Sequence, residues 1–470
     1  MVIIPSPLHP AARKVSTGHR MSSTDISRAF TSRHHDWAQV VGLGGVYLFA
    51  FFAFLGTAPA TIGTVLFTLA FVGRLSHWRS LAADRLMQLC LAYGGYLLVH
   101  SLVFWLTAPS PMLAHEIARS GWDWIALLQF IPFAYWAAGR EDRAQRLLFL
   151  ALIGFTLDIL RNIDWATFDA AFFNTRFGAN LPANAFGMFT GLGILGLVAM
   201  RGRFWKRPTP GAGRLPWIGL WVLLAVVMAE GLALSLSRGS WLAFAAAVVV
   251  LLVAEWRAGR TNNQGGRANV VGAAVVVSLI LAFLVGLNAG SIKGRIAADS
   301  GTINQITQGR ITAPPSDSAG LRLHVWRFGL EKWAERPWFG WGAGSSYYLI
   351  EHSGRPDLRD GAFWLDHLHN TYLEILVQLG AVGFGLISLL LLVLVLGVVQ
   401  ECRAGRVSGD LCRLFAASLA FVLVWSLFEY RVVKHDWIFF WILFAGTAYS
   451  FRLRASRKGE VAAPASGCTP

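Results

Sequence analysis

Apolar runs of about 20 residues recur along almost the whole chain, and short polar segments separate them. A helix of roughly 20 apolar residues is long enough to cross the hydrocarbon core of a bilayer. The pattern predicts twelve such helices, at residues 38–57, 59–73, 86–107, 122–138, 146–160, 181–200, 215–236, 240–255, 269–289, 371–398, 413–429 and 436–450. We therefore expect an all-α polytopic membrane protein.

The polar segments between these runs indicate the topology. The seven segments that would share a side with the N-terminus are all basic, as the positive-inside rule requires of the cytoplasmic side. Both termini are then cytoplasmic. The expected parts are a tail at 1–36, spans at 37–289, one large outer loop at 290–370, spans at 371–450 and a tail at 451–470. Within the loop, the stretch SAGLRLHVWRFGLEKWAERPW predicts a helix that Ser318 caps and Pro337 ends.

The composition agrees with a membrane location, since 55% of the residues are apolar and 14% are charged. A soluble domain carries about 25% charged residues. The net charge of +15 would suit nucleic acid, but the basic residues lie in the short connections between spans, so membrane lipids are the expected surroundings and nucleic acid is not an expected partner. The four cysteines form no CxxC pair, which predicts neither a disulfide framework nor a zinc site.

The outer loop meets the next apolar run in DHLHNTYLEILVQLGAVGFG, where nine residues separate His369-Asn370 from Gly380 and Gly383 follows three positions later. A neutral imidazole at a junction between loop and membrane can remove a proton from a substrate hydroxyl. It can equally cap or hydrogen-bond the start of the tenth helix, and the position alone leaves both readings open. His367 is expected to point elsewhere, with a structural or substrate-contact role.

Three arginines on the predicted outer side are candidates for binding an anionic substrate. Arg238 lies between two apolar spans without an acidic neighbour in sequence, so it either serves a functional site or extends to the outer interface. Arg161 and Arg176 flank the outer segment 161–180. Because Asp158 precedes Arg161 by three residues, a helix-end ion pair is the alternative reading there.

Two further arginines and one glutamate complete the candidate set. Arg322 and Arg327 belong to the predicted loop helix, where a solvated helix face is the simpler reading of each. Glu230 lies two turns before Arg238 and could contact Arg238, a sugar or another helix. No acidic pair or helix-spaced histidine pair indicates a metal site, so we expect no metal ion and no other cofactor. Arginines would then stabilise the charge of an anionic leaving group.

Three motifs resemble those of a known family. They are the His369-Asn370-x9-Gly380-xx-Gly383 string, the Arg238-xxx-Leu242 pair and the RxxxWRxGLEKWxExPWFGWGxG run from Arg322 to Gly344. Together they are similar to the bacterial O-antigen ligases, whose superfamily includes O-antigen polymerases and protein O-oligosaccharyltransferases. The resemblance covers about residues 230–390.

The resemblance implies a GT-C-like membrane glycosyltransferase of the bacterial inner membrane, with its active site facing the periplasm. Such a ligase moves an O-antigen glycan from undecaprenyl diphosphate to a sugar hydroxyl of lipid A–core, in lipopolysaccharide biosynthesis. It works without metal and with inversion at the anomeric carbon. His369 and Arg238 would be catalytic. The residues that would contact the diphosphate or the sugars are Arg161, Arg176, Arg322, Arg327, His367 and Glu230.

Other functions remain open at this point. A polymerase would use the same donor with a second lipid-linked glycan as acceptor. A protein O-oligosaccharyltransferase would use a serine or threonine side chain, and those enzymes often carry a further soluble C-terminal region, which the chain is not expected to have. A lipid-carrier flippase or transporter could also use arginines in its spans, but matched inverted repeats, typical of transporters, are not evident.

Overall fold

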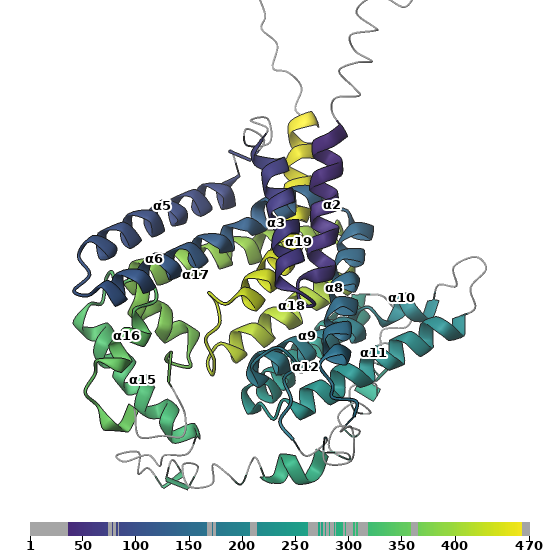
Figure 1. The fold of residues 1–470 in the computed structure, drawn as a ribbon. Coiled ribbons are helices and arrows are strands. Elements are labelled where there is room, and N and C mark those ends of the chain that lie inside the picture. The colour runs from purple at the N-terminus through teal and green to yellow at the C-terminus, as the bar shows by residue number, and fades with distance from the viewer. Residues whose placement is uncertain are drawn as a thin grey trace, which may run out of the picture.

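The computed structural model describes residues 36–73, 78, 81–82, 84–166, 172, 175–206, 214–261, 318–358 and 365–462, with scattered residues between 271 and 308. All regular structure in these ranges is helical, which confirms the all-α class (Figure 1). The expected span at 269–289 and the expected tails at 1–36 and 451–470 lie wholly or partly outside the described residues.

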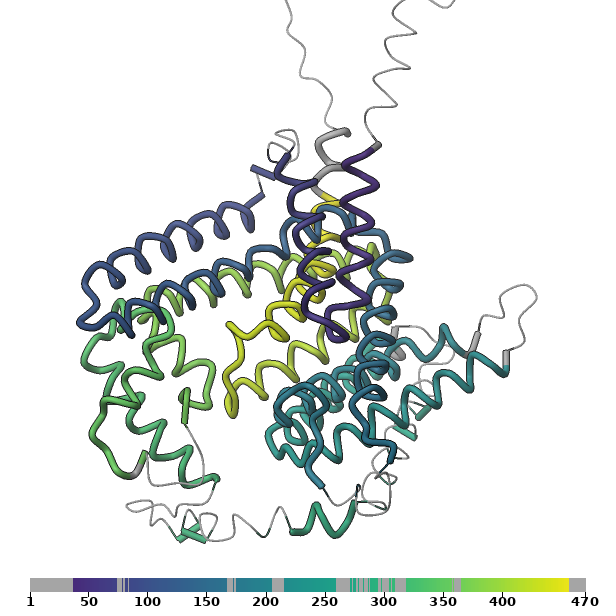
Figure 2. The backbone as a smooth tube through the Cα atoms, in the orientation of Figure 1, coloured from purple at the N-terminus to yellow at the C-terminus, as the bar shows by residue number. Residues whose placement is uncertain are grey.

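One group of helices surrounds the two ends of the described chain. Helix α2 (Asp36–Phe52) packs along α3 (Thr57–Val72), and the ring of Phe49 in α2 contacts that of Phe439 in α19 (His435–Ala462). Helix α2 begins at the end of the molecule where α19 finishes (Figures 1 and 2). Gly45 and Gly63 face each other where α2 crosses α3, and a Cβ on either would lie 2.8 Å from the other's carbonyl oxygen. Small residues thus let these two helices pack closely.

Helices α5 (Arg85–Leu106) and α6 (Pro111–Ala126) form a second layer that runs beside α17 (Thr371–Arg403) (Figure 1). A 3₁₀ turn, η1 (Leu127–Gln129), then leads into α7 (Phe130–Ala137) and α8 (Glu141–Arg161). The single span expected at 122–138 is therefore divided, which corrects its predicted bounds. Pro132 contributes to the division because it has no N–H to donate to the carbonyl one turn earlier.

The third group holds α9 (Ala183–Ala199), α10 (Arg201–Lys206), α11 (Arg214–Leu234), α12 (Arg238–Thr261) and α18 (Gly409–Trp425). Helix α12 packs along α18 and also against α9. The loop helices α15 (Ser318–Glu335), α16 (Ser345–Glu351) and η3 (Pro356–Leu358) pack at the N-terminal end of α17 (Thr371–Arg403) (Figures 1 and 2). A small separate core that includes Val325, Phe328, Leu368 and Val377 joins them.

Four of the described helices are long and apolar enough to cross a membrane: Arg85–Leu106, Leu215–Leu234, Arg238–Ala258 and Thr371–Arg403. These helices support the expectation of a membrane protein. Every other predicted span except the ninth coincides wholly or in part with a described helix. The number of twelve spans and the outer placement of the loop stay predictions.

The turn between α17 and α18 carries a disulfide between Cys402 and Cys412. The expectation of unpaired thiols at these positions was therefore wrong. The two cysteines are ten residues apart, and the turn brings their Cα atoms to 6.0 Å. No sequence motif marks this pairing, because the reversal between two helices creates it.

Helix α17 is interrupted at Gly380, whose φ of 66° and ψ of −174° lie outside the helical region. The loop segment 336–344 fills the interruption. The amides of Ala381 and Val382 donate to the carbonyls of Pro337 and Trp338, at 2.8 and 3.1 Å. The backbone groups that the interruption frees are therefore paired with the loop instead of with the helix itself.

The same loop segment also donates to α17 on the other side of the interruption. The amides of Trp341 and Gly342 donate to the carbonyls of Val377 and Gln378, at 2.9 and 3.0 Å. A Cβ on Gly380 would lie 2.2 Å from the carbonyl oxygen of Trp338. The first glycine of the predicted string is thus explained by a positive φ and by this close backbone approach.

We expect Gly380→Ala to destabilise the protein and Gly385→Ala to leave its stability nearly unchanged. A residue with a Cβ at this positive φ with ψ near 180°, a conformation essentially restricted to glycine, costs about 1–3 kcal/mol, and the contact with Trp338 adds to that cost. A Cβ on Gly385, in the same helix, meets nothing within 4 Å. Thermal unfolding midpoints in detergent measure both effects. Equal midpoints for the two variants would contradict the account of the interruption.

Candidate functional site

The turn before α17, residues 365–370, is held in place by hydrogen bonds at the start of that helix. Oδ1 of Asn370 accepts from the amides of Tyr372 and Leu373, at 3.0 and 3.1 Å, and so caps the helix. Thr371 donates its amide to the carbonyl of Ser426 at 2.8 Å and its hydroxyl to the carbonyl of Glu429 at 2.7 Å. The turn is therefore fixed against the segment that follows α18.

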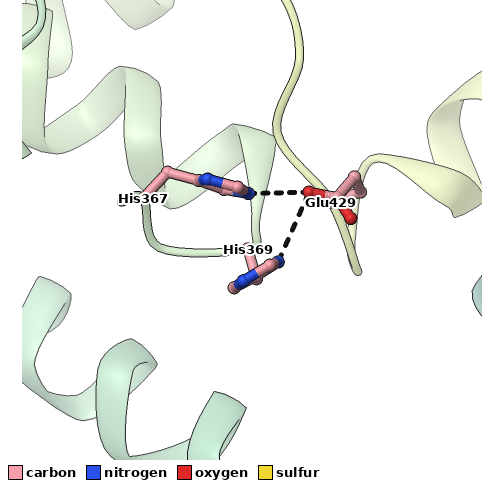
Figure 3. Close-up of side chains that lie close together, drawn as sticks. All are labelled: His367, His369 and Glu429. Carbon is pink, nitrogen blue, oxygen red and sulfur yellow. Dashed lines mark hydrogen bonds and ion pairs between the residues drawn. The ribbon is translucent and has the colours of Figure 1, made fainter. Parts of the chain in front are cut away.

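Two histidines of this turn meet one carboxylate oxygen. Oε1 of Glu429 lies 2.7 Å from Nε2 of His367 and 3.3 Å from Nδ1 of His369 (Figure 3). The ring centroids of the two histidines are 4.1 Å apart. The expectation that His367 points elsewhere was wrong, because the turn is not extended. His369 has a φ of 50°, and both rings reach Glu429.

His367 is a charged imidazolium at neutral pH. Burial lowers its pKa, but hydrogen bonds from Nδ1 to Asp366 and from Nε2 to Glu429 outweigh burial and raise the pKa to about 10. Burial likewise opposes ionisation of the two carboxyl groups, yet the contacts with His367 lower the pKa of Asp366 to about 2 and hold that of Glu429 well below its usual range. A positive ring thus lies between two negative carboxylates.

His369 is neutral at the same pH. Burial lowers its pKa, and Glu429 opposes this, but the positive charges of His367 and Arg322 lower it further. Its Nδ1 lies 3.3 Å from Oε1 of Glu429, a contact that favours the tautomer with the ring proton on that nitrogen. The other ring nitrogen points away from Glu429 (Figure 3) and presents a lone pair. A neutral imidazole held in one tautomer can act as a general base.

Glu429 also lines a polar pocket that opens to solvent. The lining residues are Asn184, Leu236, Ser237, Arg238, Gly239, Arg322, Trp425, Phe428 and Glu429. Two of the arginines predicted from the sequence, Arg238 and Arg322, therefore share one pocket although 84 residues separate them in the chain. Both are half-buried. The prediction that a solvated face is the simpler reading of Arg322 was wrong.

Three helices begin beside this pocket. Asn184 lies in the first turn of α9, Arg238 is the first residue of α12, and Ser318, the first residue of α15, accepts a hydrogen bond from Arg238 at 2.9 Å. The N-terminal end of a helix carries a partial positive charge and amides that no helical carbonyl accepts. Three such ends and two guanidinium groups make the pocket suitable for an anion.

The arginines of the outer segment 161–180 differ in their relation to the pocket. Arg176 donates to the carbonyl of Ser235 at 3.1 Å and to Oδ1 of Asn184 at 2.8 Å, and Asn184 donates in turn to Oε2 of Glu429. Arg161 instead pairs with buried Asp158 at 2.6 Å. The structure thus ties Arg176 to the site through Asn184 and places Arg161 in the helix-end ion pair that was the alternative to a substrate contact.

Arg327 and Glu230 lie away from the pocket lining. The side chain of Arg327 is 74% exposed and pairs with Glu331 at 3.1 Å, which fits a solvated helix face. Oε2 of Glu230 accepts from Asn288 at 3.2 Å. Glu230 therefore contacts a residue of the segment before the loop, and no contact with Arg238 is seen among the described residues.

Sequence reasoning missed Glu429 and Asn184. Glu429 had a usable signal, because it is an acidic residue at the outer end of the eleventh predicted span and on the same predicted side as His369. Asn184 had no comparable signal, since an asparagine at the start of a span is common. The contact between His369 and Glu429 joins residues 60 positions apart and arises from packing.

The side chains of His367, His369 and Glu429 could also hold a metal ion, because one ligand atom from each lies within 4.8 Å of the others. Their arrangement favours hydrogen bonding. The distance of 2.7 Å from His367 to Glu429 is that of a hydrogen bond, and Asp366 and Glu429 stabilise the protonated ring, which cannot bind a metal.

The raised pKa of His367 predicts a pH-dependent stability. Because the folded-state pKa of about 10 exceeds the ordinary value of 6.5, the stabilisation is complete below pH 6.5 and is lost as the pH rises toward 10. We expect the thermal midpoint of the unmodified chain to fall across this window more steeply than that of His367→Gln, which cannot titrate. Parallel curves for the two proteins would refute a charged His367.

Residues 223–388 match the family model of the O-antigen ligases. The matched segment contains Arg238, Arg322, both histidines and the interruption at Gly380, whereas Glu429 lies beyond it. The match confirms the resemblance to the O-antigen ligase superfamily that the three sequence motifs predict. No curated protein matches the chain as a whole or in part.

Proposed function

We propose that this chain, as a member of the O-antigen ligase superfamily, transfers a glycan from undecaprenyl diphosphate to a sugar hydroxyl of lipid A–core at the periplasmic face of the inner membrane. One observation carries the proposal. Glu429 contacts the histidine pair and also lines the pocket that contains Arg238 and Arg322. A general base and an anion site are therefore adjacent, as a transfer from a diphosphate leaving group requires.

The donor's diphosphate binds in the arginine pocket. Negative charge grows on its bridging oxygen as the glycosidic bond breaks, and Arg238 and Arg322 stabilise that charge. Guanidinium groups suit this task because they present several donors in a plane that matches phosphate oxygens. The N-terminal ends of α9, α12 and α15 add fixed dipoles of the same sign.

His369 removes the proton of the acceptor hydroxyl. The hydroxyl oxygen forms a bond to the anomeric carbon, the bond from that carbon to the phosphate oxygen breaks, and the diphosphate leaves with the electron pair. The proton passes to the ring nitrogen that points away from Glu429. Attack on the face opposite the leaving group inverts the anomeric carbon. The proton is afterwards released to solvent.

Glu429 supports His369 in two ways. Its carboxylate holds the proton on Nδ1, so that the other nitrogen is free to accept, and it stabilises the imidazolium that forms during transfer. The positive charge of His367 compensates Glu429 before the reaction, which keeps His369 neutral and ready to accept a proton. Arg176 contributes through Asn184, which donates to the second oxygen of Glu429.

The nearest alternative functions share parts of this site. An O-antigen polymerase or a protein O-oligosaccharyltransferase would use the same pocket and base and would differ only in its acceptor. A lipid-carrier flippase would need the anion pocket but no general base. The neutral histidine beside the pocket therefore favours a transferase over a flippase.

We expect His369→Ala to abolish transfer without loss of the folded protein. Loss of a general base costs roughly 10²–10⁴-fold in rate. In cells that depend on this chain, a lipopolysaccharide gel should lose its whole ladder while the lipid-linked glycan polymer persists. A single O-unit attached to core would indicate a polymerase instead.

His352→Ala is the matched control for this experiment. His352 lies in the same loop, is exposed and contacts Tyr348, away from the pocket. This variant should keep a normal ladder. A fully active His369→Ala variant would exclude His369 as the base, and an inactive His352→Ala variant would show that the loop tolerates no histidine loss at all.

Transfer by the purified protein should continue in the presence of a strong chelator. The hydrogen bond from His367 to Glu429 engages this carboxylate, and the charge of the leaving group is left to Arg238 and Arg322. The rate of glycan transfer in EDTA, compared with the rate in added Mg²⁺ or Zn²⁺, measures this. A loss of activity that one of these ions restores would instead assign the three side chains to a metal site.

A further inference from the structure

A buried polar chain runs behind the histidine turn along α17. Glu374 accepts from the amide of Leu368 through Oε2 and from Nε2 of Gln378 through Oε1, both at 2.8 Å. Oε1 of Gln378 accepts from the amide of Gly344 at 2.9 Å and from Nε1 of Trp124 at 3.3 Å. Two side chains thus connect the histidine turn to the loop segment 336–344 and to α6.

Four members of this polar chain are buried away from water. Glu374 is 1% exposed and Gln378 is 2% exposed, and Leu368 and Trp124 are fully buried, whereas Gly344 is half-buried. A buried N–H group that loses its acceptor carries the full cost of its desolvation. The hydrogen bonds among the four buried residues are therefore costly to lose.

The two ends of this buried polar chain fix which of its groups donate and which accept. Both ends are N–H donors: the amide of Leu368 at one end, and the amide of Gly344 with the indole of Trp124 at the other. Two linked side chains can satisfy donors at both ends only if one of them is an amide and the other accepts at both oxygens. The pair needs one carboxylate and one amide.

We propose that Glu374 is a positioning residue for His369, and that Gln378 makes this positioning depend on the seated loop segment 336–344. Leu368 lies between His367 and His369, so the bond to its amide fixes the turn from which both rings reach Glu429. The inference rests on the proposed role of His369 as the base. Neither Glu374 nor Gln378 lines the arginine pocket.

The loop segment is itself anchored in the interruption of α17, where it exchanges four backbone hydrogen bonds with residues 377–382. Gly344 is the last residue of that segment, and its amide is also the donor at one end of the buried polar chain. The histidine turn is therefore in its active geometry only when the segment is seated. This arrangement links the loop segment 336–344 to the turn that carries the base.

Exchange of the two side chains tests the proposal. In Glu374→Gln both side chains are amides. Whichever way each amide is turned, two N–H donors then face each other at one of the links. In Gln378→Glu, two carboxylates face each other. The double variant Glu374→Gln with Gln378→Glu restores one carboxylate and one amide. Its new carboxylate can accept from Gly344 and Trp124 and also from the hydroxyl of Tyr430, which lies 3.3 Å from Nε2 of Gln378.

We expect Glu374→Gln to lower kcat by about 10- to 100-fold while the apparent KM for the lipid-linked donor stays unchanged, because the arginine pocket is intact. The double variant should recover kcat to within about threefold of the unmodified chain. Transfer of glycan from undecaprenyl diphosphate to lipid A–core by the full-length protein in detergent gives both constants per folded molecule. Thermal midpoints report folding separately.

Glu401→Gln is the control, since Glu401 is a buried carboxylate at the far end of the same helix and pairs with Arg406. It should change the midpoint but not kcat. An unchanged kcat in Glu374→Gln, or a double variant that is inactive or does not fold, would overturn the positioning role. If His369→Ala were fully active as well, both the positioning role of Glu374 and the proposed function would be overturned. An inactive His369→Ala beside an active Glu374→Gln would overturn this inference alone.

Discussion

One carboxylate oxygen, Oε1 of Glu429, lies within contact distance of two imidazoles, and the rest of the site is arranged around this constraint. A buried carboxylate needs compensating charge, which His367 supplies. Because that charge is already present, His369 stays neutral and keeps a free nitrogen. The other oxygen of Glu429 accepts from Asn184 at the wall of the arginine pocket, so one side chain sets the geometry of both halves of the site.

The fold supports this carboxylate with contacts from distant segments. Thr371 binds the carbonyl of Glu429, Glu374 binds the turn that carries the histidines, and the interruption at Gly380 seats the loop that completes the chain of hydrogen bonds. These contacts use backbone groups that lie outside the regular helices, or that the interruption at Gly380 removes from the hydrogen bonds within the helix. The irregular part of α17 is therefore the part that the site needs, while the regular remainder is apolar and long enough to lie in a membrane.

The sequence predicted the helices well and the site in part. Apolar periodicity located the helices, but it could not foresee the turn that divides 122–138 or the interruption at Gly380, because both depend on local backbone chemistry inside an apolar run. The prediction grouped His369 with Arg238, and in the structure Glu429 contacts His369 and lines the pocket that contains Arg238. It separated His367 from His369, since a turn with a positive φ at His369 has no sequence signature. Arg161 shows the opposite case, where spacing from Asp158 gave the observed ion pair.

We propose that the anion pocket and the neutral histidine serve one reaction. A cryo-electron microscopy structure of the full chain with an undecaprenyl diphosphate-linked glycan would show whether they do. We expect the diphosphate within hydrogen-bond distance of Arg238 and Arg322, with the anomeric carbon on the side of His369 and with both histidines still in contact with Glu429. A diphosphate bound elsewhere, or a metal ion held by His367, His369 and Glu429, would contradict it.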